Sequence, residues 1–162
     1  MRHVALAVAG VVVVLLVAPG GDLAFAQGAD EGTACVLNTR LSPENEVRTP
    51  ANTNDPTVES TATGHAQVKV RNDGTLEIKV FILNQDAETF TAGHIHEGPA
   101  GANGPVVVPL FSGTFTGEHF VQHEVVAVPP EFDPLELCEA PDEYYVNYHT
   151  TQDPVGATRG QL

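Results

Sequence analysis

The sequence predicts an all-β domain, an antiparallel Greek-key β-sandwich of about seven or eight strands. Three observations favour this fold class. Apolar and polar residues alternate with a period of two over several short segments. Turns rich in glycine and proline separate these segments. No segment shows a helical period over three turns, so helices are not expected to build the core.

The clearest strands are the segments 61–70 and 76–82. In the first, alanine, glycine and valine alternate with threonine, histidine, glutamine and lysine, and in the second, leucine, isoleucine and valine occupy every other position. Between them lies 71–74, Arg-Asn-Asp-Gly, a tight-turn signal because asparagine, aspartate and glycine tolerate a positive φ. The two segments are expected to form an antiparallel hairpin with one buried face.

The other strands are expected on both sides of this hairpin. Segment 42–59 carries three prolines among polar residues and is expected to be a long loop. Glycine and proline also predict an irregular connection over 97–105, and prolines among acidic residues predict another over 131–143. The remaining strands are expected over 34–41, 91–97, 106–111, 114–128, 144–150 and 157–162.

The N-terminal segment predicts export. Arg2 precedes an apolar run too short to span a bilayer comfortably, and Ala-Phe-Ala at 24–26 has the small-x-small pattern of a cleavage site. We therefore expect a signal peptide over 1–26 that is cleaved near Ala26, a flexible leader over 27–33 and the folded domain over 34–162. The mature chain is expected to be secreted, extracellular or periplasmic, without membrane insertion.

The formal net charge of −14 narrows the range of partners. An acidic surface repels polyanions, so neither nucleic acid nor anionic lipid is expected as a partner. Such a surface favours cations and basic proteins, or simply keeps the protein soluble.

Cys35 and Cys138 are the two cysteines of the chain. In an oxidising compartment an even pair predicts a disulfide bond. The alternative is that a thiolate binds a metal ion.

The histidines near the middle of the chain indicate a site. In an extended strand His94 and His96 share one face, and Ile95 points to the core. Two imidazoles side by side supply half of a tetrahedral or square-planar metal site.

The segment 144–150 supplies a third imidazole. If Val146 and Tyr148 are core residues, Asn147 and His149 lie on the opposite face. If this strand is a neighbour of the His-x-His strand, His149 converges on the other two imidazoles, which suits zinc or copper. The spacing is similar to that of the copper ligands of copper–zinc superoxide dismutase.

Other residues are expected to complete or support this site. Additional candidate ligands are His65 and Glu97, and Glu97 is alternatively expected to pair with Arg159 and brace the following loop. Asn147 is expected to donate a hydrogen bond beside the site or to anchor a loop. The structural residues of the loop itself are Gly98, Gly101 and Gly104. Two alternatives remain: the histidines hydrogen-bond buried carbonyls without any metal, or they act as a proton-linked switch.

The sequence resembles the CHRD domain, first described in chordin and widespread in exported bacterial proteins. The resemblance rests on two dense motifs and a weaker opening match, which are the segments 92–107, 145–162 and 41–64. His65, Ala157 and Thr158 depart from the family's usual residues. The resemblance implies an immunoglobulin-like or superoxide-dismutase-like sandwich, and the family has no agreed biochemical activity.

We therefore expect a secreted metal-binding module that holds copper or zinc. The alternative is an extracellular module that binds a protein or glycan, or forms part of a matrix, with purely structural histidines. No nucleophile elbow, paired carboxylates or phosphate-binding loop occurs, so no catalytic residue is assigned and an enzyme is not expected. A copper redox enzyme would require an open coordination position and a path for its substrate.

Overall fold

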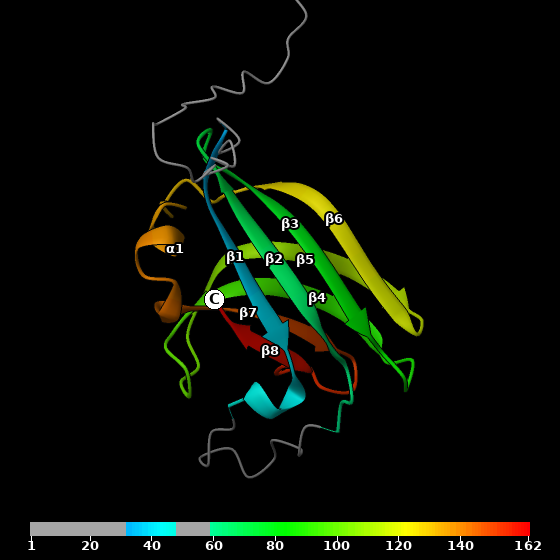
Figure 1. The fold of residues 1–162 in the computed structure, drawn as a ribbon. Helices are drawn as coiled ribbons and strands as arrows, with labels where there is room; N and C mark the ends of the chain where they lie inside the picture. Colours follow the sequence, from blue (N-terminus) through cyan, green and yellow to red (C-terminus); the bar gives the residue numbers. More distant parts are fainter. Residues whose placement is uncertain (1–31, 48–58) are drawn as a thin grey trace, which may run out of the picture. The chain divides into compact units, whose positions relative to one another are not determined.

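A computed structural model describes residues 32–47 and 59–162. These residues form eight β-strands in two antiparallel four-stranded sheets that pack face to face, which confirms the predicted all-β sandwich (Figure 1). The signal peptide expected over 1–26 and nearly all of the expected leader lie outside the described residues. No helix within the described ranges has the length and apolar character needed to cross a bilayer.

The first sheet has the strand order β1-β2-β3-β6. Its strands are β1 (Thr33–Leu41), β2 (Thr63–Arg71), β3 (Thr75–Leu83) and β6 (His119–Ala127). The second sheet has the order β5-β4-β7-β8. Its strands are β4 (Thr89–Glu97), β5 (Val106–Thr116), β7 (Tyr144–Thr150) and β8 (Thr158–Gln161). The short helices are η1 (Pro43–Asn45), α1 (Glu136–Glu139) and η2 (Pro141–Glu143).

The predicted hairpin is the pair β2–β3. Its alternation places one row of apolar side chains against the second sheet, and Val68, Leu76 and Ile78 are fully buried there. Burial of apolar surface stabilises the fold by roughly 25 cal/mol per Å², so these rows supply much of the driving force. Gly74 closes the hairpin with a φ of 82°.

The prediction of one strand over 114–128 is wrong. The chain turns at Gly117 and Glu118, so that β5 ends in the second sheet and β6 begins in the first. Buried Asn84 fixes this corner, because its side-chain amide donates to the Gly117 carbonyl (2.7 Å) and its backbone N–H donates to the Glu118 carbonyl (2.8 Å). The connection expected to be irregular over 131–143 includes the single turn of α1.

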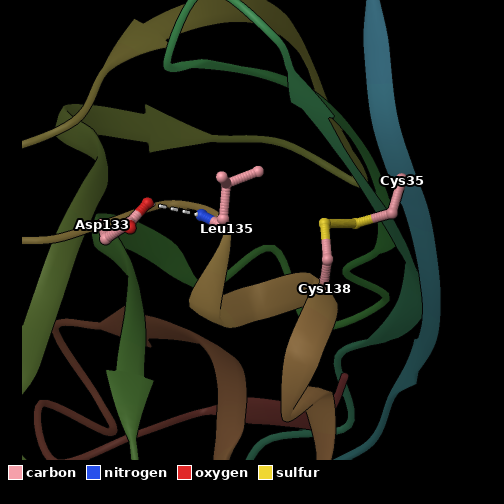
Figure 2. Close-up of a disulfide and its surroundings, with 4 residues drawn as sticks. All are labelled: Cys35, Asp133, Leu135 and Cys138. Atoms are coloured by element: carbon pink, nitrogen blue, oxygen red, sulfur yellow. Dashed lines mark hydrogen bonds between the residues drawn. A yellow bond between two sulfur atoms is a disulfide. The ribbon is translucent and has the colours of Figure 1, made fainter.

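The predicted disulfide joins Cys35 to Cys138 (Figure 2). It ties α1 to the edge strand β1, and the thiolate alternative is wrong because both sulfur atoms are bonded. The Leu135 N–H donates to the Asp133 carboxylate (3.0 Å) and orders the turn that leads into α1 (Figure 2).

Both faces of β7 are buried. Val146 and Tyr148 point into the sandwich, as the sequence predicted. The outer face is covered by three connections, because Tyr145 contacts the loop after β4, Asn147 contacts the segment after η1, and His149 contacts the loop after β7. The outer face of β7 is therefore an interior polar layer.

Candidate metal centre

Three imidazoles lie together in this polar layer. His94 and His96 belong to β4, and His149 belongs to β7, which pairs with β4 along its whole length. One nitrogen from each ring lies within 4.8 Å of the others. His94 Nδ1 and His149 Nε2 lie 3.1 Å apart. The structure therefore brings together two segments that are far apart in the chain.

A β-bulge in β4 orients the two histidines of that strand. Phe90 and Ile95 are both core residues, although they are an odd number of positions apart and strict alternation would place them on opposite faces. The register of β4 against β7 shifts between Phe90 and Ala92, and this extra residue restores the alternation. His94 and His96 consequently point outward while Phe90 keeps its place in the core.

Backbone carbonyls fix the tautomers of two of the rings. His96 Nδ1 lies 3.0 Å from the Gly104 carbonyl oxygen, and His149 Nδ1 lies 3.2 Å from that of Pro154. A carbonyl oxygen only accepts, so Nδ1 carries the hydrogen in both rings and Nε2 carries the lone pair. Each Nε2 can therefore act as a hydrogen-bond acceptor or as a metal ligand.

The two Nε2 atoms differ in their surroundings. His149 Nε2 accepts a hydrogen bond from His94 Nδ1. His96 Nε2 is buried and has no hydrogen-bond partner among the described residues. A buried acceptor without a partner costs about 1–3 kcal/mol, so a partner bound at this atom would be favourable.

The cluster is neutral near pH 7. Burial lowers the pKa of His94, His96 and His149, and for His149 burial together with the two neighbouring imidazoles lowers the pKa to about 4. His96 and His149 are only 8% and 9% exposed. Neutral imidazoles are the form that binds metal ions.

Tyr145 and Arg159 form the wall beside His96. The rings of His96 and Tyr145 stack, with their centroids 4.8 Å apart and their planes within 9°. The guanidinium carbon of Arg159 lies 3.3 Å from the centroid of the same tyrosine ring. Both residues are almost fully buried, so His96 has little freedom to change its orientation.

The loop between β4 and β5 is held over the cluster by neutral acceptors. Arg159 donates to the Pro99 carbonyl (3.3 Å) and to Asn103 Oδ1 (3.2 Å). The Gly104 N–H donates to the Tyr145 hydroxyl (3.1 Å). Arg159 thus braces this loop through these groups and not through the expected ion pair with Glu97.

The sequence model of the CHRD domain matches residues 37–162. The chain belongs to the CHRD domain family. The match includes both strands of the histidine cluster and the loop above it, so the cluster is part of the CHRD domain of this chain. Comparison with curated proteins and with solved structures gave no match.

The structure does not bring every candidate ligand of this CHRD domain to the cluster. His65 is exposed on β2, in the other sheet, where it lies opposite Phe81. Glu97 is exposed, and it follows His96 on the opposite face of β4. Asn147, which was expected as a donor beside the site or an anchor of a loop, lies opposite His94, and its side-chain amide donates to a Glu46 carboxylate oxygen (3.3 Å) in the segment after η1.

Sequence reasoning missed two contributors to this layer. Glu46, beyond η1, holds Asn147, and no periodic pattern connects it with β7. Tyr145 appeared only within a motif, although its place one residue before the core residue Val146 predicts an outward ring. That parity could have identified the stack on His96.

The glycines of the loop have different roles. A Cβ on Gly104 would overlap the Glu97 carbonyl, whereas Gly101 has a φ of 81° with open space around it. A Cβ on Gly98 would only touch the Tyr145 ring and the loop's own backbone. Gly104 is therefore the position of this loop at which a side chain is least tolerated.

Gly104→Ala is expected to destabilise the CHRD domain by about 1–3 kcal/mol, because the clash is with backbone and forces the loop off the cluster. Urea unfolding measures the change. Gly113→Ala is the matched control, since a Cβ there meets only the Phe111 ring at ordinary contact distance. Equal stability of the two variants would contradict this account of the loop.

Proposed function

We propose that this CHRD domain binds one copper or zinc ion through His94 Nδ1, His96 Nε2 and His149 Nε2. The observation that carries the proposal is the buried Nε2 of His96, which has no partner within the described part of the chain. An ion at the centre of the cluster would supply that partner. Neutral imidazoles are ligands that both copper and zinc accept.

The cluster needs one local change to accept an ion. His94 Nδ1 now donates its hydrogen to His149 Nε2. Binding requires that this hydrogen move to Nε2 of His94, so that the two facing nitrogens both present lone pairs. When bound, the ion would hold charge and orient one further ligand, because three histidines leave a coordination position open.

A purely architectural role is the second candidate. It is favoured by the carbonyl contacts of Gly104 and Pro154, which use Nδ1 of His96 and His149 to fix two loops. Such a role needs only Nδ1 of each ring. An architectural role leaves the unfavourable free energy of the partnerless Nε2 of His96 without compensation. A bound metal ion would compensate it, and this favours the metal-binding role.

Asparagine separates the two roles. The side-chain amide nitrogen of asparagine takes roughly the place of Nδ1, so His96→Asn keeps the donor to Gly104 and removes Nε2. Protein without a histidine tag is titrated with copper and with zinc. We expect one ion per wild-type chain, and a loss of affinity in His96→Asn that exceeds the roughly 10–100-fold caused by losing an outer hydrogen-bond partner.

His65→Asn is the control, because His65 is exposed on the other sheet. It is expected to bind metal like the wild type. Wild-type affinity in His96→Asn, with its stability reduced or not, would remove the metal-binding proposal and leave the architectural one.

We further propose that the domain acts outside the cytoplasm. The disulfide between Cys35 and Cys138 supports this location, since such bonds persist in oxidising compartments. The signal-peptide pattern over 1–26 supports it independently.

A further inference from the structure

The outer face of the first sheet concentrates positive charge on an acidic protein. Four of the five lysines and arginines in the described residues lie on its strands, and alternation directs their side chains outward. These four are Arg40, Lys69, Arg71 and Lys79. The fifth is the buried Arg159 of the other sheet.

Little negative charge opposes these cations. The four strands contain two carboxylates, Glu77 and Glu124. Glu124 is paired with the core residue Ile78 and therefore lies on the inner face of the sheet, so Glu77 is the carboxylate of these strands on the outer face. Glu77 lies 3.1 Å from Lys79 and 3.9 Å from Lys69. The four cations and Glu77 leave a charge of about +3 on the strands, and Asp73, which interacts with Arg71 from the turn after β2, reduces this excess to about +2, whereas the whole chain carries −14.

The same face contains a hollow of about 710 Å³. Charged and aromatic side chains surround it, and they include Arg40, His65, Lys79 and Phe81. None of the described helices or strands covers these strands (Figure 1), and Phe81 is 43% exposed. The exposed Phe81 ring and the exposed Val121 side chain give the hollow an apolar part beside the cations.

Amide groups lie between the cations. Asn38 and Gln67 face each other on β1 and β2, and the Gln67 amide donates to Asn38 Oδ1 (2.9 Å). Each keeps further donor or acceptor capacity toward the hollow. Across the strands, Gln67 is also paired with Lys79, so Asn38, Gln67 and Lys79 form one row. In the neighbouring row, His65 lies between Arg40 and Phe81. Rows on one face are about 7 Å apart, so charge and hydrogen-bonding groups repeat along the strands.

We propose that this face binds an acidic polysaccharide, whose carboxylate or sulfate groups pair with Arg40 and Lys79. The Phe81 ring would pack against the apolar face of a sugar, and Asn38 and Gln67 would bond its hydroxyls. The acidic remainder of the surface does not prevent this contact, because charges beyond a Debye length of about 10 Å are screened at 0.1 M salt.

A carbohydrate fits this face better than an acidic peptide. A peptide strand gains most of its affinity from main-chain hydrogen bonds at a sheet edge. The hollow instead lies over the middle of the sheet, where the backbone groups of β2 and β3 are paired with their neighbours. The hollow therefore offers side chains to a partner. Those of Asn38, Arg40, Gln67 and Lys79 can bond hydroxyls and anions, and Phe81 and Val121 add apolar surface.

The test is a calorimetric titration of the full chain at about 0.1 M salt. Metal is removed beforehand and a chelator is present, so that the result is independent of the histidine cluster. The probes are alginate oligosaccharides and dextran sulfate, with neutral dextran and poly-L-glutamate for comparison. Arg40→Gln with Lys79→Gln is compared with Ser112→Asp and Thr114→Asp, two exposed positions of β5 that change the net charge by the same amount.

We expect wild-type protein to bind alginate or dextran sulfate, with affinity falling as salt increases. The double glutamine variant is expected to bind at least about tenfold more weakly, and the β5 variant to stay close to wild type. Thermal unfolding checks that both variants fold. Failure of both acidic polymers to bind, equal weakening in the two variants, equal binding of dextran, or stronger binding of poly-L-glutamate would each overturn the proposal.

Discussion

Replacing Cys35 and Cys138 by serine is expected to lower the free energy of unfolding by about 4–5 kcal/mol. The disulfide closes a loop with a sequence separation of 103 residues, and the unfolded chain gains that loop's conformational entropy when the bond is removed. Since domains of this size are stable by about 5–15 kcal/mol, the variant should lie near the limit of folding.

Urea unfolding at neutral pH measures this change. Wild-type protein held in reductant is the natural control, because it loses the same bond without a change of sequence. Both samples should also show a larger dependence on urea, since an uncrosslinked unfolded chain exposes more surface. A loss of stability below about 1 kcal/mol in both samples would contradict the expectation.

Acid is expected to destabilise the metal-free domain between about pH 6.5 and pH 4. The pKa of His149 is about 4 in the folded protein and 6.5 in the unfolded chain, so the unfolded chain binds more protons in this range. Stability therefore falls as the pH decreases. The difference of 2.5 pH units corresponds to a loss on the order of 3 kcal/mol for His149. His94 and His96, whose pKa values are also lowered, act in the same direction.

Unfolding measured across this pH range checks the expectation. His149→Asn should flatten the profile, because asparagine keeps a donor to the Pro154 carbonyl and does not titrate. If the cluster binds an ion, saturating zinc should move the loss of stability in the wild type to lower pH, since ion and protons compete for the same nitrogens. A profile that is identical in wild type and His149→Asn would contradict the assigned pKa.

Parity along single strands predicted much of the candidate site. Outward placement of His94 and His96, and of His149 beside core residue Tyr148, follows from alternation alone. The pairing of β4 with β7 did not follow from the sequence and was stated as a condition. It depends on tertiary packing, as does the bulge near Phe90 that corrects the alternation at the start of β4.

The boundaries that failed were set by contacts between distant residues. The segment 114–128 alternates through Gly117 without a strong break, and the corner there is made by Asn84 from another part of the chain. The sequence likewise offered Glu97 as the partner of Arg159, because opposite charges attract. The folded chain instead directs that guanidinium to carbonyl and amide oxygens of the loop.

The net charge of the whole chain gave no sign of the cations on the outer face of the first sheet. The value of −14 led to the exclusion of nucleic acid and anionic lipid as partners. The alternation of β2 and β3 already placed Lys69, Arg71 and Lys79 on one face, and this pattern could have been read from the sequence. Charge counted per face, rather than per chain, is therefore the better guide for a sandwich.

The stack of Tyr145 on His96 also places an intrinsically fluorescent side chain directly beside the candidate metal centre. The chain has three tyrosines and no tryptophan, and all three tyrosines belong to β7. Ultraviolet fluorescence of the folded protein thus originates beside the imidazole cluster. If the cluster binds an ion as proposed, copper(II), with its unfilled d shell, should quench this emission, whereas zinc, with a filled shell, should leave most of it intact. The light emitted by the unlabelled protein would thereby distinguish the two metals.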